Sequence, residues 1–180
     1  MSESSFAVAL VHYPILNRKG ERSTTAVTSI DIHDFVRTCA MYDVGPVYMV
    51  HPAEAMHALV QDVAGYWLEG AGEARNPGRT ESIRSLRLAK SLEEVLEAET
   101  YTLWYTSATP PDGVSVNVNK IPKIKGKHLI VFGTGSGLDY EAMPKPNGWL
   151  SPIEGIGMVR HLSVRAALAI YLDRLTRERC

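Results

Sequence analysis

Short apolar runs alternate along this chain with longer segments in which apolar residues recur every three or four positions. The runs have the length of strands and are rich in β-branched and aromatic residues, so they predict buried strands. They occupy residues 6–12, 46–50, 86–89, 101–105, 128–132 and 149–153. Strands that are apolar throughout must be covered on both sides. The pattern therefore predicts an α/β fold, a mostly parallel sheet with helices on both faces.

The longer segments carry the stripes of amphipathic helices. In the first, Asp31 is the predicted N-cap, with Asp34 three residues later as in a capping box. Its buried face is predicted to be Ile32, Phe35, Val36 and Cys39. A second helix should follow Pro52 and bury Met56, Leu59, Val60, Val63 and Trp67. A third should bury Val164, Leu168, Tyr171, Leu172 and Leu175.

Shorter features complete the predicted order of elements. Ser91 should cap a brief helix that ends at Ala98. Residues 13–23 and 70–80 are rich in glycine, asparagine and charged side chains, and both predict exposed loops. No repeat or linker interrupts the pattern, so the 180 residues are expected to form one domain over residues 1–180.

Composition narrows the class of protein. The hydrophobic share is 45%, yet no apolar run reaches the roughly 20 residues that span a bilayer, so no membrane association is expected. Two cysteines, Cys39 and Cys180, cannot form a disulfide framework and favour a cytoplasmic location. No histidine or cysteine pair has the spacing of metal ligands, and no metal is expected. The net charge of −1 gives no overall attraction to nucleic acid, although lysines gather at 120–127 and arginines at 75–87.

Ligands of parallel α/β sheets bind at the carboxyl ends of the strands. Three predicted loops lie there, at residues 106–109, 133–137 and 152–163. The second, Gly133-Thr-Gly-Ser-Gly137, has two readings from its glycines alone. One is a nicotinamide dinucleotide site, which would need a long helix directly after the loop. The other is a tight turn between the sheet and the next segment.

Three motifs together resemble those of the SpoU-type branch of the SPOUT RNA methyltransferases. The third motif is matched by His161-Leu-Ser-Val-Arg-Ala-Ala-Leu-Ala-Ile170, and the second by Phe132-Gly-Thr-Gly-Ser-Gly-Leu138. The first has its counterpart in Asp31-Ile-His-Asp-Phe-Val-Arg-Thr38. With Asn17-Arg-Lys-Gly20 and Asn76-Pro-Gly-Arg79, the chain resembles a small stand-alone family of S-adenosylmethionine-dependent RNA methyltransferases, sometimes fused to tRNA guanine-N1 methyltransferase.

The resemblance implies a C-terminal deep trefoil knot, a homodimer, S-adenosylmethionine as cofactor, and a structured RNA, tRNA in the first instance, as substrate. Arg37 would activate the acceptor or pair with a phosphate, and Asp31 would act as base or cap its helix. The implied cofactor-binding residues come from all three loops. They are Thr106, Ser107, Ala108, Gly133, Thr134, Gly135, Ser151, Pro152, Ile153, Gly155, His161, Leu162 and Ser163.

Departures from the SpoU pattern leave the acceptor open. The glutamate of the second motif is missing from residues 134–136, and Asp31 and Ser163 stand where the pattern has asparagine. Ribose and base methylation are therefore both compatible with the motifs. The missing glutamate also leaves room for an RNA-interaction module that binds the cofactor without catalysis.

Overall fold

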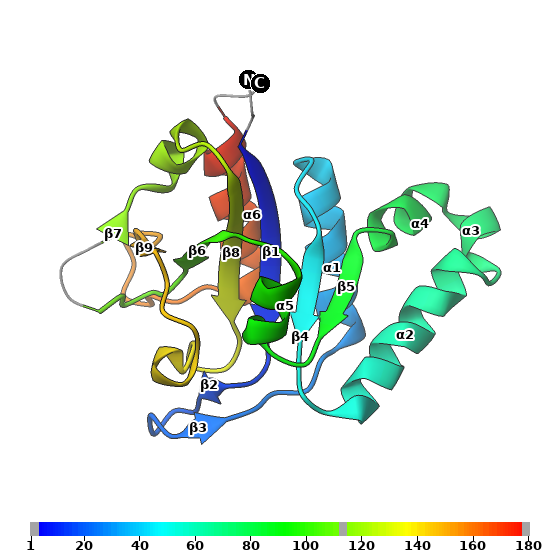
Figure 1. Cartoon of the computed structure of the whole chain (residues 1–180), viewed down its shortest axis with the longest axis horizontal. Helices are drawn as coiled ribbons and strands as arrows, with labels where there is room; N and C mark the ends of the chain where they lie inside the picture. Colours follow the sequence, from blue (N-terminus) through cyan, green and yellow to red (C-terminus); the bar gives the residue numbers. More distant parts are fainter. Residues whose placement is uncertain (1–3, 112–114, 178–180) are drawn as a thin grey trace.

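A parallel sheet of seven strands forms the centre of the molecule, in a computed structural model that describes residues 4–111 and 115–177. The strand order is β5-β4-β1-β8-β6-β9-β7, and every pairing between neighbours is parallel. The strands are β1 (Ser5–Val11), β4 (Val47–Val50), β5 (Leu86–Ala89), β6 (Thr102–Tyr105), β7 (Ser115–Val116), β8 (Lys127–Gly133) and β9 (Gly148–Leu150). The predicted α/β class and its parallel sheet are confirmed (Figure 1).

Strands β1 and β8 lie in the middle of the sheet, and the side chains of β1 are buried on both faces. Val8 and Leu10 point into one hydrophobic cluster and Ala7, Ala9 and Val11 into another, as the two-residue period of a strand requires. All five side chains are at most 1% exposed. The sheet therefore separates two cores, one on each face.

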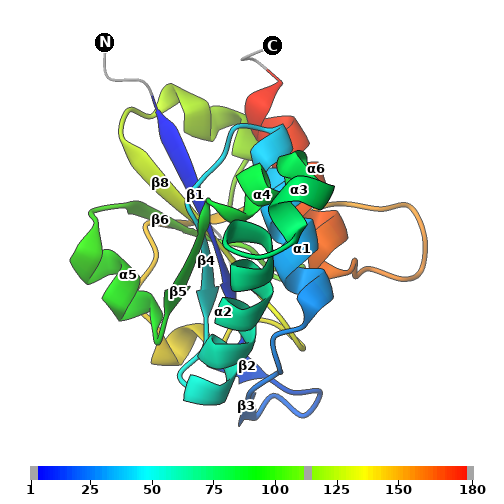
Figure 2. The same cartoon turned by 90° about the vertical axis from the view of Figure 1, so that its right-hand side faces the viewer.

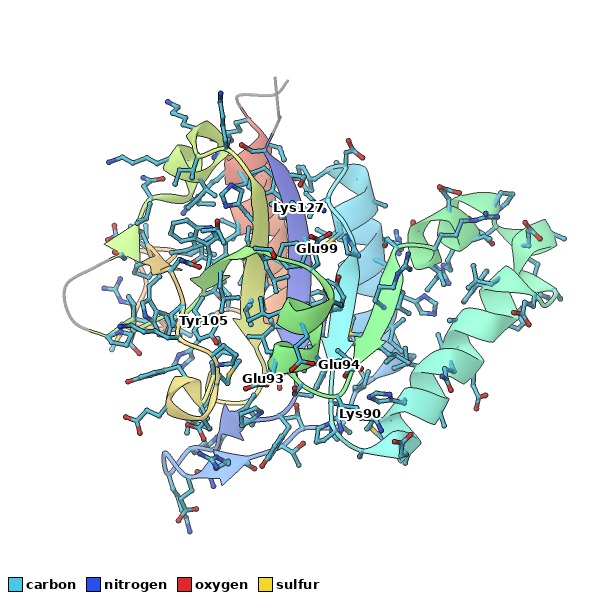
Figure 3. The ribbon with its side chains drawn as sticks, in the orientation of Figure 1. Lys90, Glu93, Glu94, Glu99, Tyr105 and Lys127 are labelled. Atoms are coloured by element: carbon cyan, nitrogen blue, oxygen red, sulfur yellow. The ribbon has the colours of Figure 1, made fainter. Side chains whose placement is uncertain are left out.

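Helices cover the two faces unequally (Figures 1 and 2). One face carries α1 (Ser29–Met41), α2 (Glu54–Leu68), α6 (Val164–Thr176) and the 3-10 helix η1 (Val118–Lys123). The other carries α5 (Leu92–Ala98), whose predicted cap, Ser91, accepts from the Glu94 N–H at 3.3 Å. Figure 3 shows this second face, where the Lys127 ammonium pairs with Glu99 directly after α5. The ion pair ties the end of α5 to the start of β8.

Two predicted loops are partly ordered into regular elements. Residues 13–23 contain a small hairpin, β2 (Ile15–Leu16) with β3 (Arg22–Ser23), because the apolar Ile15 is buried to 2% exposure. Residues 70–80 contain α3 (Gly72–Arg75) and most of α4 (Pro77–Ile83). Asn76 caps α4 and Pro77 occupies its first turn, a favourable pair for a helix start. Both loop predictions were wrong in these parts.

Two helix predictions also need correction. The N-cap of α1 is Thr28, and Asp31 is the third helical residue that completes the capping box. In α2 only Val60 is buried, because the helix packs against α4 and the outer strand β5 instead of the middle of the sheet. Leu59 is 37% exposed. Cys180 lies outside the described residues, and among those described no helix is long and apolar enough to cross a membrane.

Candidate functional site

The three loops expected to bind the cofactor leave the same edge of the sheet. Strands β8, β6 and β9 are neighbours and parallel, so their carboxyl ends lie along the same edge of the sheet. Strand β8 ends toward the bottom of Figure 1. The first loop is fixed to β8, because the Thr106 N–H and hydroxyl both donate to the Val131 carbonyl, at 3.1 and 3.0 Å. The second is fixed to β1, because the Thr134 N–H donates to the Val11 carbonyl at 3.2 Å.

The second loop needs its glycines for the turn itself. A Cβ on Gly133 would lie 2.8 Å from the Leu138 nitrogen. Gly135 has a φ of +60°, and a Cβ there would lie 2.7 Å from the Ile15 side chain. The loop then enters a 3-10 helix of three residues, η2 (Tyr140–Ala142). The loop makes a tight turn, in which the Gly137 N–H donates to the Thr134 carbonyl at 3.1 Å, and a long helix of the kind that a nicotinamide site requires does not follow it.

The third loop is anchored at both ends and open in between. The Ser151 carbonyl accepts from the Tyr171 hydroxyl at 2.9 Å, and Ser163 caps α6 by accepting from the Ala166 N–H at 3.3 Å. The intervening residues project from the body of the protein (Figure 2). His161 and Leu162 are exposed, whereas Ser151 and Pro152 line a cavity of about 330 Å³.

The residues of this edge fit S-adenosylmethionine. The amides of Ser107, Ala108 and Gly135 donate no hydrogen bond to any described residue, and Ala108 and Gly135 are exposed. Free loop amides are suitable donors to the polar edge of an adenine. Ile153 is half-buried against the core and offers an apolar surface for its ring. A Cβ on Gly155 would meet nothing within 4 Å, so that position is open to a ligand.

Asp31 connects the first motif with the third. Its Oδ2 accepts from the Thr28 N–H and hydroxyl, at 3.2 and 2.6 Å. Its Oδ1 accepts from Nη1 of Arg165 in the first turn of α6, at 2.9 Å, and the residue is only 6% exposed. Both carboxylate oxygens are therefore engaged by protein donors. Asp31 fixes the start of α6, and hence the end of the third loop, against α1.

Arg37 lies elsewhere on the same helix. It is nine residues after the N-cap, which corresponds to roughly 13 Å along the helix axis. Helix α1 contacts both α6 and α4, and Arg37 lines a cavity on the α4 side. Within one chain, the structure therefore does not bring Arg37 to the three loops.

A hydrogen-bond network that the sequence did not reveal, containing the buried His12 and His51, holds the second loop. His12 directly follows β1, and its Nδ1 lies 3.0 Å from Oγ1 of Thr25. That hydroxyl lies 2.5 Å from Oγ1 of Thr134, and Thr24 bonds His51, the residue after β4, at 3.1 Å. Burial lowers the pKa of His12 to about 4, although the nearby Asp31 carboxylate acts in the opposite direction. The only signal in the sequence was a histidine placed immediately after each of two strands.

The fold, the three motif loops and the matching sequence model define the class of protein. The model of the family described as SAM-dependent RNA methyltransferase matches residues 5–177, so the chain belongs to that family. The expected S-adenosylmethionine dependence and the enzyme class are thereby confirmed. No group of three or more histidine, cysteine or acidic residues suited to a metal occurs in the described parts of the chain.

Individual relatives agree with this assignment. An uncharacterized protein of Aquifex aeolicus is 36% identical over all of this chain and 93% of its own length. The tRNA (guanine-N(1)-)-methyltransferases of Nitratidesulfovibrio vulgaris and Oleidesulfovibrio alaskensis are 32% and 30% identical over 93% of the chain. The chain spans 41% of the length of each of these two proteins.

Solved structures share the fold at low sequence identity. The TrmH/SpoU tRNA modifying enzyme of A. aeolicus has a TM-score of 0.60 at 19% identity, covering 97% of this chain and 75% of its own. The SpoU methyltransferase AviRb from Streptomyces viridochromogenes, solved in complex with AdoMet, has a TM-score of 0.59 at 13% identity. It covers 99% of this chain and 62% of its own. The SPOUT resemblance is confirmed at the level of fold.

Proposed function

We propose that this protein transfers the methyl group of S-adenosylmethionine to a nucleotide of a structured RNA, and that the RNA is tRNA. The observation that carries the proposal is the convergence of the three motif loops at one edge of the sheet, where loop amides have no hydrogen-bond partner among the described residues. The tRNA substrate is supported by the relatives named tRNA (guanine-N(1)-)-methyltransferase. The cytoplasm, which contains both tRNA and cofactor, is the proposed location.

In this proposal the chain's residues hold and orient the reactants, and the cofactor supplies an electrophilic methyl group. The cofactor site consists of residues 106–108, 133–135, 151–153, 155 and 161–163. Asp31 acts through Arg165 to position the third loop, because both of its oxygens are already engaged. Arg37 activates the acceptor or pairs with a phosphate of the RNA, from a position on the opposite flank of α1.

A homodimer accounts for the distance between Arg37 and the loops of its own chain. In the dimer we propose, Arg37 serves the site of the partner. The third loop supports the presence of an interface that a partner covers, because its apolar residues Ile156 and Met158 are 107% and 100% exposed. Exposed apolar runs of this kind mark interfaces. Ile30, which is 56% exposed beside the Asp31–Arg165 pair, is a further exposed apolar residue on α1.

A trefoil knot in the C-terminal part completes the proposal. Its support is the path of the chain after β8. That path enters the sheet again as β9 between β6 and β7, then returns as α6 to pack against η1, α1 and β8. A return of this kind is what threading a terminal helix through a loop requires.

The first experiment is a titration of S-adenosylmethionine into the protein by calorimetry, followed by methyl transfer to unmodified tRNA. Saturable binding at one site per chain with methyl incorporation would support the enzyme. Binding without incorporation into any RNA would support the non-catalytic module. Gly155→Ala should weaken cofactor binding without changing the melting temperature, because the new methyl group enters open space at the site.

The dimer has its own test. Sedimentation should give twice the chain mass of 19.8 kDa, and Met158→Lys should give the monomer. Monomer formation should abolish methyl transfer while cofactor binding by the separate chains can still be measured. A wild-type protein that is monomeric and fully active would refute the shared site.

A further inference from the structure

A second cavity lies on the outer side of α1, away from the sheet edge that carries the motif loops. It measures about 320 Å³ and is formed by α1 and α4, which pack side by side (Figure 2). Its lining is Arg37, Ala40 and Met41 from α1 with Asn76, Gly78, Arg79 and Ser82 from the α4 region. We call it the α1–α4 groove. Its two ionisable residues are both arginines, and its lining contains no acidic residue.

Neither arginine has an acidic partner among the described residues. The neighbouring Arg84 does have acidic partners: it pairs with Glu73 and Glu81, at 3.6 and 3.4 Å. The uncompensated charge of the groove is also felt nearby. The pKa of His33 is lowered, first by burial and then by the charge of Arg79. The Asp34 carboxylate acts in the opposite direction, and Arg37 adds a smaller lowering. The groove is therefore a local centre of positive charge on a chain whose net charge is −1.

Arg79 is held in place without its charge being neutralised. Its guanidinium lies 4.8 Å from the centre of the Trp67 ring, a cation–π contact that restricts its rotation. Its backbone N–H donates to the Asn76 side chain at 3.1 Å. Its Nε is buried and has no hydrogen-bond partner in the described structure. The Arg79 guanidinium therefore keeps hydrogen-bonding capacity that the described residues leave unused.

We propose that the α1–α4 groove binds a backbone phosphate of the RNA, with Arg79 as its fixed donor and Arg37 as the second. This inference rests on the proposed function, because it names how the same substrate is held. Planar guanidinium groups match phosphate oxygens in geometry and charge. The groove is open on the surface of the protein, so a continuous nucleic-acid strand can cross it.

The test compares Arg79→Gln with Arg84→Gln, an arginine of the same region that is already paired. Binding of tRNA is measured by fluorescence anisotropy over a series of salt concentrations. Arg79→Gln should weaken binding about tenfold at about 0.1 M salt and reduce the slope of log K against log salt by about 0.7 to 0.9, the loss of one phosphate contact. Arg84→Gln should leave the slope unchanged. Circular dichroism melting and calorimetric titration of S-adenosylmethionine should give the same values for both variants.

Each outcome is decisive. If both variants bind tRNA with the wild-type slope, the groove inference is overturned, and methyl transfer by the wild type can still establish the proposed function. If the wild type methylates no RNA but Arg79→Gln alone loses affinity and slope, the groove stands and the proposed function fails. Inorganic phosphate is titrated separately by calorimetry. Saturable phosphate binding that needs Arg79, combined with an unchanged tRNA slope, would assign the groove to a free phosphate compound and overturn the RNA inference.

Discussion

Buried His12 should make the stability of the protein fall in weak acid. The side chain is fully buried, and its pKa is lowered from 6.5 to about 4. Between these values the unfolded chain binds a proton that the folded protein does not bind, so the free energy of unfolding decreases as the pH falls through 6.5. At about 1.4 kcal/mol per pH unit, the loss is about 2 kcal/mol at pH 5 and about 3 kcal/mol at pH 4. Above about pH 7.5 the contribution is constant.

The assay is urea unfolding of the wild type and of His12→Asn over about pH 8 to 5. Asparagine keeps a polar group near Thr25 but does not titrate. The free energy of unfolding of His12→Asn should therefore fall by about 2 kcal/mol less than that of the wild type over this pH range. Other buried histidines, among them His51 and His128, also have lowered pKa values, and the difference between the two proteins removes their effect. The control is the same substitution at the exposed His161. Equal acid losses in wild type and His12→Asn would refute the assignment of the buried neutral state to His12.

Three further predictions concern single side chains. Gly133→Ala should destabilise the fold by about 2 kcal/mol in urea unfolding, because the new Cβ would lie 2.8 Å from a backbone atom. A destabilisation no larger than that of Gly155→Ala would contradict this steric explanation. Arg165→Met should lower the free energy of unfolding by about 2 kcal/mol, because it leaves the buried carboxylate of Asp31 without its cation. It should also weaken cofactor binding measured by calorimetry. Wild-type values for both quantities would contradict the link between α1 and α6. Burial raises the pKa of the Cys39 thiol to about 12. In a Cys180→Ser background, a thiol reagent at about pH 8 should therefore label the protein only after unfolding. Rapid labelling of the folded protein would contradict the burial of Cys39.

The elements that the sequence predicted well are those with a strong local pattern. The apolar run at 128–132 and the stripe of Ile32, Phe35, Val36 and Cys39 are both buried as expected. Local patterns gave wrong predictions where the burial of a segment depended on which distant element packs against it. The stripe of α2 meets a neighbouring helix and an outer strand, so most of it stays partly exposed, and the hairpin at 13–23 forms because it packs against the second loop.

The same limit applies to the candidate site. The order of the strands brings the three motif loops to one edge, and neighbouring strands in a sheet cannot be read from motif spacing alone. The His12–Thr25–Thr134 network joins residues more than a hundred positions apart through single hydroxyl groups, which leave no periodic trace. By contrast, Asn76 followed by Pro77 is a helix-start signal that the sequence did contain, and it could have predicted α4.

The place of β1 in the sheet has a consequence for how the chain folds during synthesis. Its seven residues pair in register with β8, from Ser5 with Lys127 to Val11 with Gly133. Those partners lie about 120 residues later, which at about 5–20 residues per second corresponds to roughly 6–24 s of translation. During that time one edge of an apolar strand has no partner of its own chain. Slow folding and a need for protection of the nascent β1 edge follow directly from this long-range pairing.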